Sequence, residues 1–268
     1  MRLDASGKVT LDHIYTAPDP RTYFQVLRPL GYRVPQLAKP RFAELIEEYR
    51  ETERVAVPHV LDIGCSYGIN AALLKHDTTM DELYARYDGG GPATRAALLE
   101  RDRDLARSRP PAHPLHFTGL DASTAALAYA REAGFLDAAV HADLEADDPT
   151  PAQRELLAGT DLVISTGCIG YITGRTLTRV VRAQDGRLPW MAHFVLRMFP
   201  FDPVEEALAE LGYRTVRADG VFRQRRFASP QERRGVLDGM AAAGIDARGL
   251  EETGWLYAQL YLSRPQHG

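Results

Sequence analysis

The stretch that decides the fold is Val60-Leu-Asp-Ile-Gly-Cys-Ser-Tyr-Gly68. Its first four residues predict a short buried strand, which runs into a tight glycine turn and then into a helix over residues 69–74. A strand that ends in such a turn brings backbone amides and a helix N-terminus up to a ligand at the carboxyl edge of a sheet. Asp62 lies two residues before the first glycine, and its carboxylate favours a cationic ligand group over a pyrophosphate.

Strands and helices alternate along the rest of the chain. After the strand at 60–63, further strands are expected at 115–120, 138–142, 162–165, 194–198, 221–227 and 255–262. Helices are expected at 40–49, where Pro40 opens the helix, and at 124–132, 152–157, 176–181, 202–212 and 229–244. Strands that alternate with helices form a parallel sheet covered on both faces. The sequence therefore predicts one α/β domain over residues 1–268, with a doubly wound, mostly parallel, seven-stranded sheet.

Three segments fall outside this alternation. Residues 1–36 are aromatic and dense in proline, which excludes a continuous helix, and either dock on the core or form a flap over a pocket. Tyr15 and Tyr23 are the candidate substrate contacts in this flap. Residues 75–114, with a helix near 93–106, are expected to be an insertion after the first βα unit that caps an acceptor pocket or contacts a partner. Residues 228–250 form a helical excursion before the last strand.

Three further motifs follow in order, each at the end of an expected strand: Asp121-Ala-Ser123, Ala142-Asp-Leu144 and Ser165-Thr-Gly167. Together with residues 60–68, they resemble the four motifs of the class I S-adenosylmethionine-dependent methyltransferases, and the resemblance covers roughly residues 40 to 200. The ribose acid of a dinucleotide-binding fold follows the first glycines by about 20 residues. Asp121 can fill that role only if residues 75–114 are an insertion.

The resemblance implies a Rossmann-like methyltransferase fold, S-adenosylmethionine as cofactor and S-adenosylhomocysteine as product. It implies that the glycine turn wraps the methionine half, that Asp62 serves the ammonium group, that Asp121 accepts from both ribose hydroxyls, and that Asp143 accepts from the adenine amino group. Ser66 departs from the family, since it stands where the middle glycine is expected. The implied cofactor-binding residues are Asp62, Gly64, Cys65, Ser66, Gly68, Asn70, Asp121, Ala122, Ser123, Ala142, Asp143, Leu144, Ser165, Thr166 and Gly167.

The residues for the other substrate are less clearly marked. Tyr171 follows the fourth motif and either faces the acceptor or packs in the core, and Arg197 is a candidate for holding a substrate carboxylate. Carboxylate and thiolate acceptors need no base; for a hydroxyl or ammonium acceptor, Tyr171 and His193 are the candidate bases. We expect a methyltransferase for a small molecule of bacterial specialised metabolism. The alternatives are a non-methylating enzyme on this scaffold, for instance one that catalyses an intramolecular displacement or cyclisation, and a non-catalytic partner subunit.

Composition limits the partners. A net charge of −4 argues against a general nucleic-acid binder, and Arg223-Gln-Arg-Arg226 is interpreted as a solvated strand face. The two cysteines fit neither a disulfide framework nor a zinc spacing, so we expect no metal and a reducing compartment. No signal peptide or membrane span is evident, and a cytoplasmic location is expected. The sequence leaves a homo- or hetero-dimer open.

Overall fold

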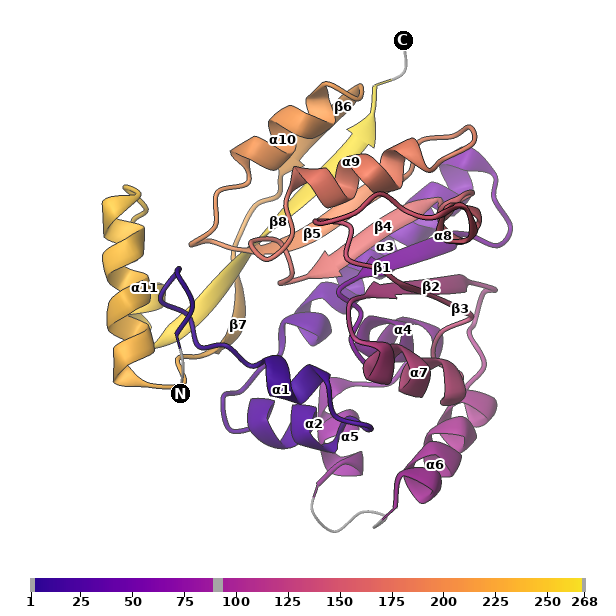
Figure 1. Ribbon diagram of the computed structural model, residues 1–268, viewed down its shortest axis with the longest axis horizontal. Coiled ribbons are helices and arrows are strands. Elements are labelled where there is room, and N and C mark those ends of the chain that lie inside the picture. Colours follow the sequence, from indigo (N-terminus) through magenta and orange to yellow (C-terminus); the bar gives the residue numbers. More distant parts are fainter. Residues whose placement is uncertain (1–2, 89–93, 267–268) are drawn as a thin grey trace.

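One mixed sheet runs through the middle of the computed structural model, which describes residues 3–88 and 94–266 (Figure 1). Its strands are β1 (His59–Ile63), β2 (His116–Asp121), β3 (Ala138–His141), β4 (Leu162–Thr166), β5 (Trp190–Leu196), β6 (Tyr213–Arg217), β7 (Phe222–Arg226) and β8 (Trp255–Pro265). The order is β3-β2-β1-β4-β5-β8-β6, with β7 paired to the start of β8 outside this path. The first five strands are parallel and β8 is antiparallel to its neighbours. The seven strands of this path form the mostly parallel sheet of the Rossmann-like methyltransferase fold, to which β7 adds an eighth strand, and the predicted fold class is confirmed.

Helices cover both faces of the sheet (Figure 1). They are α1 (Asp12–Tyr15), α2 (Arg21–Leu27), α3 (Val34–Glu53), α4 (Ile69–Lys75), α5 (Met80–Arg86), α6 (Arg95–Ser108), α7 (Thr124–Glu132), α8 (Pro151–Leu157), α9 (Gly174–Arg182), α10 (Asp202–Ala209) and α11 (Pro230–Ala242). Successive strand residues point to opposite faces. Val60 accordingly joins the core cluster under α3, α4 and α7, whereas Leu61 joins the cluster under α8, α9 and α10.

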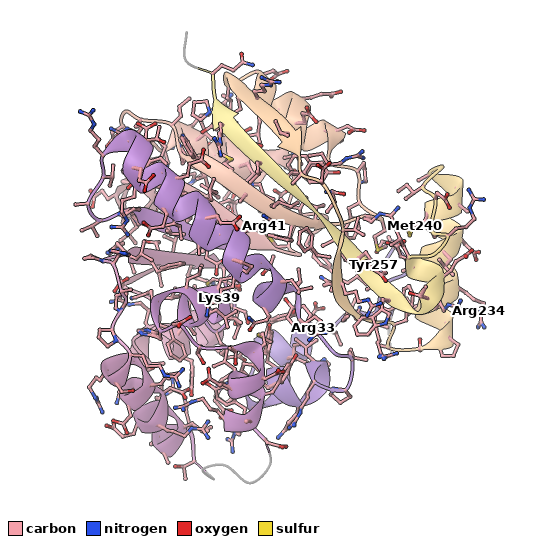
Figure 2. All side chains as sticks on the ribbon, turned by 180° about the vertical axis from the view of Figure 1, so that it is seen from behind. Arg33, Lys39, Arg41, Arg234, Met240 and Tyr257 are labelled. Atoms are coloured by element: carbon pink, nitrogen blue, oxygen red, sulfur yellow. The ribbon has the colours of Figure 1, made fainter. Side chains whose placement is uncertain are left out.

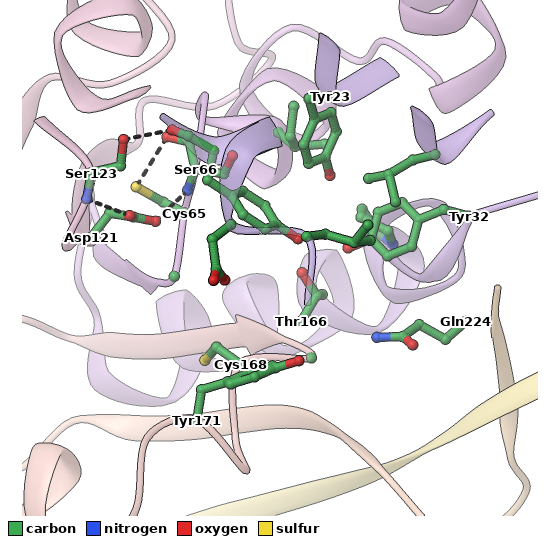
Figure 3. A pocket seen from close by; sticks show the side chains of 18 of the residues that line it. Tyr23, Tyr32, Cys65, Ser66, Asp121, Ser123, Thr166, Cys168, Tyr171 and Gln224 are labelled. Carbon is green, nitrogen blue, oxygen red and sulfur yellow. Dashed lines mark hydrogen bonds between the residues drawn. The ribbon is translucent and has the colours of Figure 1, made fainter. Parts of the chain in front are cut away.

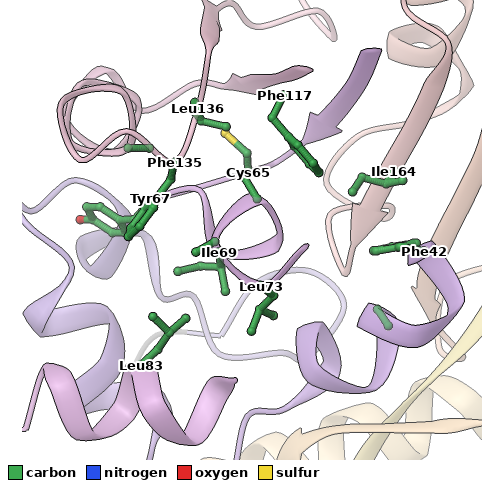
Figure 4. Close-up of a cluster of buried hydrophobic side chains, with 14 of the residues drawn as sticks. Phe42, Cys65, Tyr67, Ile69, Leu73, Leu83, Phe117, Phe135, Leu136 and Ile164 are labelled. Carbon is green, nitrogen blue, oxygen red and sulfur yellow. The ribbon is translucent and has the colours of Figure 1, made fainter. Parts of the chain in front are cut away.

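The core on the α3 side is the larger of the two. Figure 4 shows Phe42 of α3 and Leu73 of α4 in it, with Phe117 of β2 and Ile164 of β4. Figure 2 shows α3 lying across the back of the sheet, with Lys39 and Arg41 on it. Helices therefore cover both faces of the sheet. The carboxyl ends of β1, β2 and β4, which lie side by side, are left available for a site.

Three differences from the prediction have a clear physical reason. β6 was not predicted, because it is an edge strand whose residues are mostly exposed and show no clear hydrophobic alternation. β5 begins at Trp190 rather than 194, since its first residues, Met191 to His193, are buried on both faces and lack the period of two. α3 begins at Val34 and contains Pro40, which costs one backbone hydrogen bond inside a helix that the core on the α3 side of the sheet holds in place.

The segment 75–114 packs into the main core. Its described part carries α5 and α6, and Leu83 and Leu98 are fully buried members of the α3-side cluster. The rings of Tyr87 and Phe24 stack at 4.4 Å between centroids, so the segment supports α2. The predicted helix near 93–106 is α6, and residue 93 lies outside the described residues. No helix in residues 3–88 and 94–266 is long and apolar enough to cross a membrane.

Candidate functional site

A cavity of about 400 Å³ opens at the carboxyl ends of β1, β2 and β4 (Figure 3). This volume is in the range that holds a small ligand. Its walls come from the glycine turn and α4, from the loops after β2 and β4, from the N-terminal segment and from β7. The lining residues are Lys8, Val9, Leu11, Asp12, Tyr15, Thr16, Tyr23, Leu27, Tyr32, Pro35, Gly64, Cys65, Ser66, Ile69, Asn70, Asp121, Ala122, Ser123, Thr166, Gly167, Cys168, Tyr171, Gln224 and Arg225.

The turn after β1 depends on its backbone conformation. Gly64 has φ +69°, and a Cβ placed there would lie 2.8 Å from the Cβ of Cys168. Ser66 also has a positive φ, +50°, which is uncommon for a residue with a side chain. Its amide donates to Asp121 Oδ2 at 2.8 Å, which stabilises this conformation. The serine in place of the family glycine is thus accommodated, and its buried Oγ has no hydrogen-bond partner among the described residues.

Asp121 joins two of the predicted motifs. Its Oδ2 accepts from the Ser66 amide and its Oδ1 from the Ser123 amide, both at 2.8 Å (Figure 3). Burial raises the pKa of this carboxyl, and the two amide bonds oppose the rise. Each carboxylate oxygen keeps a free acceptor site, which suits two vicinal hydroxyl groups.

Asp62 lies beneath the cavity wall rather than in it. The carboxyl is fully buried, and Asn70 Nδ2 donates to both of its oxygens at 3.1 and 3.2 Å and to Thr166 Oγ1 at 3.2 Å. Burial, with a contribution from nearby Asp121, raises the pKa of Asp62 to about 8. Asn70 lines the cavity, and its Oδ1 is buried without a partner among the described residues. An ammonium group at Asn70 would find a free acceptor with a carboxyl group behind it.

An aromatic wall closes the opposite side of the cavity. Tyr15, Tyr23 and Tyr32 line it, and the rings of Tyr15 and Tyr23 meet edge to face at 5.9 Å. The wall is attached to the motifs: Ser123 Oγ donates to the Tyr15 carbonyl at 2.6 Å. The Tyr67 hydroxyl, in the glycine turn, donates to the Ala17 carbonyl at 2.8 Å. The N-terminal segment thus packs directly over the predicted cofactor-binding residues.

Several predicted site residues lie elsewhere. His193 is fully buried, its Nδ1 hydrogen-bonds Ser165 Oγ at 2.8 Å, and burial lowers its pKa to about 3, so neither side chain faces the cavity. Arg197 forms an ion pair with buried Glu251 and does not line the cavity. The predictions of His193 as base and of Arg197 as carboxylate ligand are therefore corrected. His193, in the middle of β5, and Arg197, directly after β5, both face away from the cavity, which the sequence pattern alone did not indicate.

The third motif lies outside the cavity lining. Asp143 is exposed, and its Oδ1 accepts from the amides of Glu145 and Ala146 at 3.0 and 3.3 Å, so it caps the turn that follows β3. Ala142, Leu144 and Gly68 do not line the cavity either. Gly68 is the N-cap residue of α4 and has a φ of +75°. The described residues of 75–114 do not line it either, which corrects the expectation that they cap the acceptor pocket, whereas contact with a partner stays a prediction.

Sequence reasoning missed part of the cavity wall. Gln224 and Arg225, interpreted as a solvated strand face, are buried in β7 and line the cavity. Lys8 also lines it and is only 7% exposed. The sequence did contain a signal for Arg225, because Glu232, seven residues later, offers a carboxylate of opposite charge. The two side chains form a buried ion pair at 2.6 Å. Among the described residues, no group of three His, Cys, Asp or Glu side chains could hold a metal ion.

Comparison with known proteins finds similarity in structure only. No family model matches the chain, and no curated protein matches its sequence. The chain is 15% identical to the cyclase SpnF over 84% of this chain and 81% of that one, with a TM-score of 0.42. The magnesium protoporphyrin IX methyltransferase ChlM of Synechocystis PCC 6803 is 11% identical, with 84% and 78% covered and a TM-score of 0.40. The plantazolicin methyltransferase BamL is 11% identical, with 86% of each chain covered and a TM-score of 0.39. The fold assignment rests on the strand order given above.

Proposed function

We propose that this protein is an S-adenosylmethionine-dependent methyltransferase for a small molecule, acting in the cytoplasm in bacterial specialised metabolism. The observation that carries the proposal is the pair of acceptor groups in one cavity. Asp121 offers two oxygens for the ribose hydroxyls, and the unpartnered Oδ1 of Asn70, backed by Asp62, suits the ammonium group. When bound, S-adenosylmethionine supplies a sulfonium whose methyl group is already activated toward a nucleophile.

The residues of this chain then act by binding, orientation and exclusion of water. Asp121 would hold the ribose, and Asn70, with Asp62 behind it, would hold the ammonium group, which keeps the reacting atoms in position. Tyr15, Tyr23 and Tyr32 line one side of the cavity, where their rings would shield the reacting atoms from water. The cavity measures about 400 Å³ and must hold the cofactor as well, so we expect the second substrate to be a small molecule. Tyr171 lines the cavity and is retained as a substrate contact.

Calorimetry with S-adenosylmethionine and S-adenosylhomocysteine tests the first half of this proposal, and a methyl-transfer screen of small acids, amines and phenols tests the second. We expect binding of both ligands with one site per chain, and transfer to at least one acceptor class. Binding without consumption of S-adenosylmethionine during turnover of a substrate would instead support a non-methylating enzyme. Absence of binding would support a non-catalytic partner subunit.

A further inference from the structure

Lys8 places a buried ammonium group in the cavity wall. Its Nζ donates to the Tyr171 hydroxyl at 2.6 Å and lies 4.5 Å from the centroid of that ring. The other two lysines of the chain are ion-paired, Lys39 with Asp77 and Lys75 with Asp137. In the part of the chain that the structure describes, no carboxylate forms an ion pair with Lys8. Burying a cation without a counter-charge is costly, and a ligand anion would offset that cost.

The charged groups around Lys8 are committed to other partners. Glu232 forms two hydrogen bonds with Arg225, at 2.6 and 3.0 Å, and also accepts from the Val9 amide at 2.9 Å. The Asp4 carboxylate accepts from the Ser6 amide and hydroxyl at 2.9 and 2.6 Å and from the Lys8 amide at 3.1 Å. Burial and the charge of Arg225 lower the pKa of Lys8 to about 8, and Asp4 and Glu232 only partly oppose this.

A second unused polar group lies in the same wall. Gln224 is buried, and its Oε1 has no partner among the described residues. Its Nε2 lies so close to the fourth motif that a Cβ on Gly167 would be 2.6 Å from it. Figure 3 shows Gln224 and Tyr171 on the β4 and β7 side of the cavity, away from Asp121 and Ser123. This side therefore places a cation, a hydroxyl and an amide in the same cavity as the aromatic wall.

We propose that Lys8 and the Tyr171 hydroxyl bind a carboxylate of the methyl acceptor, whose planar body packs against Tyr15, Tyr23 and Tyr32. The acceptor is then a small planar acid, an inference that rests on the proposed methyltransferase function. The methionine part of the cofactor carries a carboxylate as well. We assign Lys8 to the acceptor because it contacts Tyr171 on the β4 and β7 side, whereas the predicted contacts for the methionine part, Asn70 and the glycine turn, are on the β1 side.

Benzoate and its neutral isostere benzamide serve as probes in the presence of saturating S-adenosylhomocysteine. We expect the wild-type protein to bind benzoate at least tenfold more tightly than benzamide in calorimetry. Lys8→Met, which keeps an unbranched side chain one atom shorter, should abolish this preference, and Lys8→Arg should retain part of it. Lys39→Met is the matched control, because Lys39 lies on α3 at the back of the sheet (Figure 2), and it should leave the preference unchanged.

A second measurement follows Lys8 directly. With three lysines in the chain, the amine signals of labelled lysine are few enough to assign by NMR, and benzoate should raise the pKa of Lys8 alone. Equal affinity for the two probes, no binding of benzoate at millimolar concentration, or a preserved preference in Lys8→Met would overturn the inference.

The cofactor as the source of the carboxylate is tested separately. Methylthioadenosine lacks the amino-acid part, so weaker binding of S-adenosylhomocysteine but not of methylthioadenosine to Lys8→Met would assign Lys8 to the cofactor and end the inference. Failure of the wild-type protein to bind S-adenosylhomocysteine at all would refute the proposed function instead. Normal S-adenosylhomocysteine binding without a benzoate preference would refute only the role of Lys8.

Discussion

Asp121 offers the sharpest perturbation of the proposed cofactor site. Asp121→Asn keeps the shape of the side chain and one acceptor oxygen, but removes the charge and the second acceptor. Hydrogen bonds to a charged group contribute about 1.5–3 kcal/mol each, whereas neutral ones contribute about 1 kcal/mol. Because Asp121 also holds the amides of Ser66 and Ser123, part of the loss falls on the turn itself. We expect S-adenosylhomocysteine binding to weaken by about 1–3 kcal/mol, which is roughly a 5- to 150-fold rise in Kd.

Calorimetry measures this loss, and the melting temperature without ligand separates it from damage to the fold. Asp148→Asn is the control, since Asp148 is an exposed partner of Arg179 outside the cavity lining. It should change neither Kd nor the melting temperature noticeably. An Asp121→Asn protein that melts like the wild type and binds S-adenosylhomocysteine with wild-type affinity would refute the assignment of Asp121 to the ribose.

Three further predictions concern other residues. At pH 7, binding of S-adenosylhomocysteine should release up to one proton, because its ammonium group lowers the pKa of Asp62 from about 8. Calorimetry in buffers of different ionisation enthalpy measures the proton release, and Asp62→Asn should abolish it. Lys8→Met should raise the free energy of unfolding at pH 7 by up to about 3 kcal/mol, because the lowered pKa of Lys8 means that its charged form destabilises the folded state. The gain should shrink as the pH rises from about 8 to 10.5. Urea unfolding that shows destabilisation at pH 7 would contradict this. Leu98→Ala should cost about 2–5 kcal/mol of stability although Leu98 lies in the segment 75–114, and a linker in place of that segment should prevent cooperative unfolding by circular dichroism.

The fold could be predicted where local pattern and tertiary environment agree. The strand and turn at residues 60–68 carry their own signals, namely a buried apolar run and closely spaced glycines. β6 carries no such signal, because its position at the edge of the sheet depends on pairing with β8, which comes much later in the chain. Tyr213, for example, pairs with Pro265. The core role of α5 and α6 was also hidden, since their leucines could equally face a pocket or a partner.

The candidate site divides in the same way. Asp121, Ser66 and Asn70 stand at strand ends and in the first helical turn, where topology alone brings them to one edge of the sheet. His193 stands in the middle of β5 and Arg197 directly after it, and side-chain direction turns them toward Ser165 and Glu251. Lys8 and Gln224 reach the cavity through packing of segments more than two hundred residues apart, as the Val9 amide and Glu232 show. Such contacts leave no periodic trace in the sequence.

The central claim, methyl transfer to a small molecule, is tested most directly by mass spectrometry of the product. The protein is incubated with S-adenosylmethionine carrying a ¹³C-labelled methyl group and with the planar acid, amine or phenol that the screen identifies. We predict a product heavier by one labelled methyl group, with one S-adenosylhomocysteine formed for each product molecule. Turnover of the substrate that leaves S-adenosylmethionine unconsumed would contradict the claim.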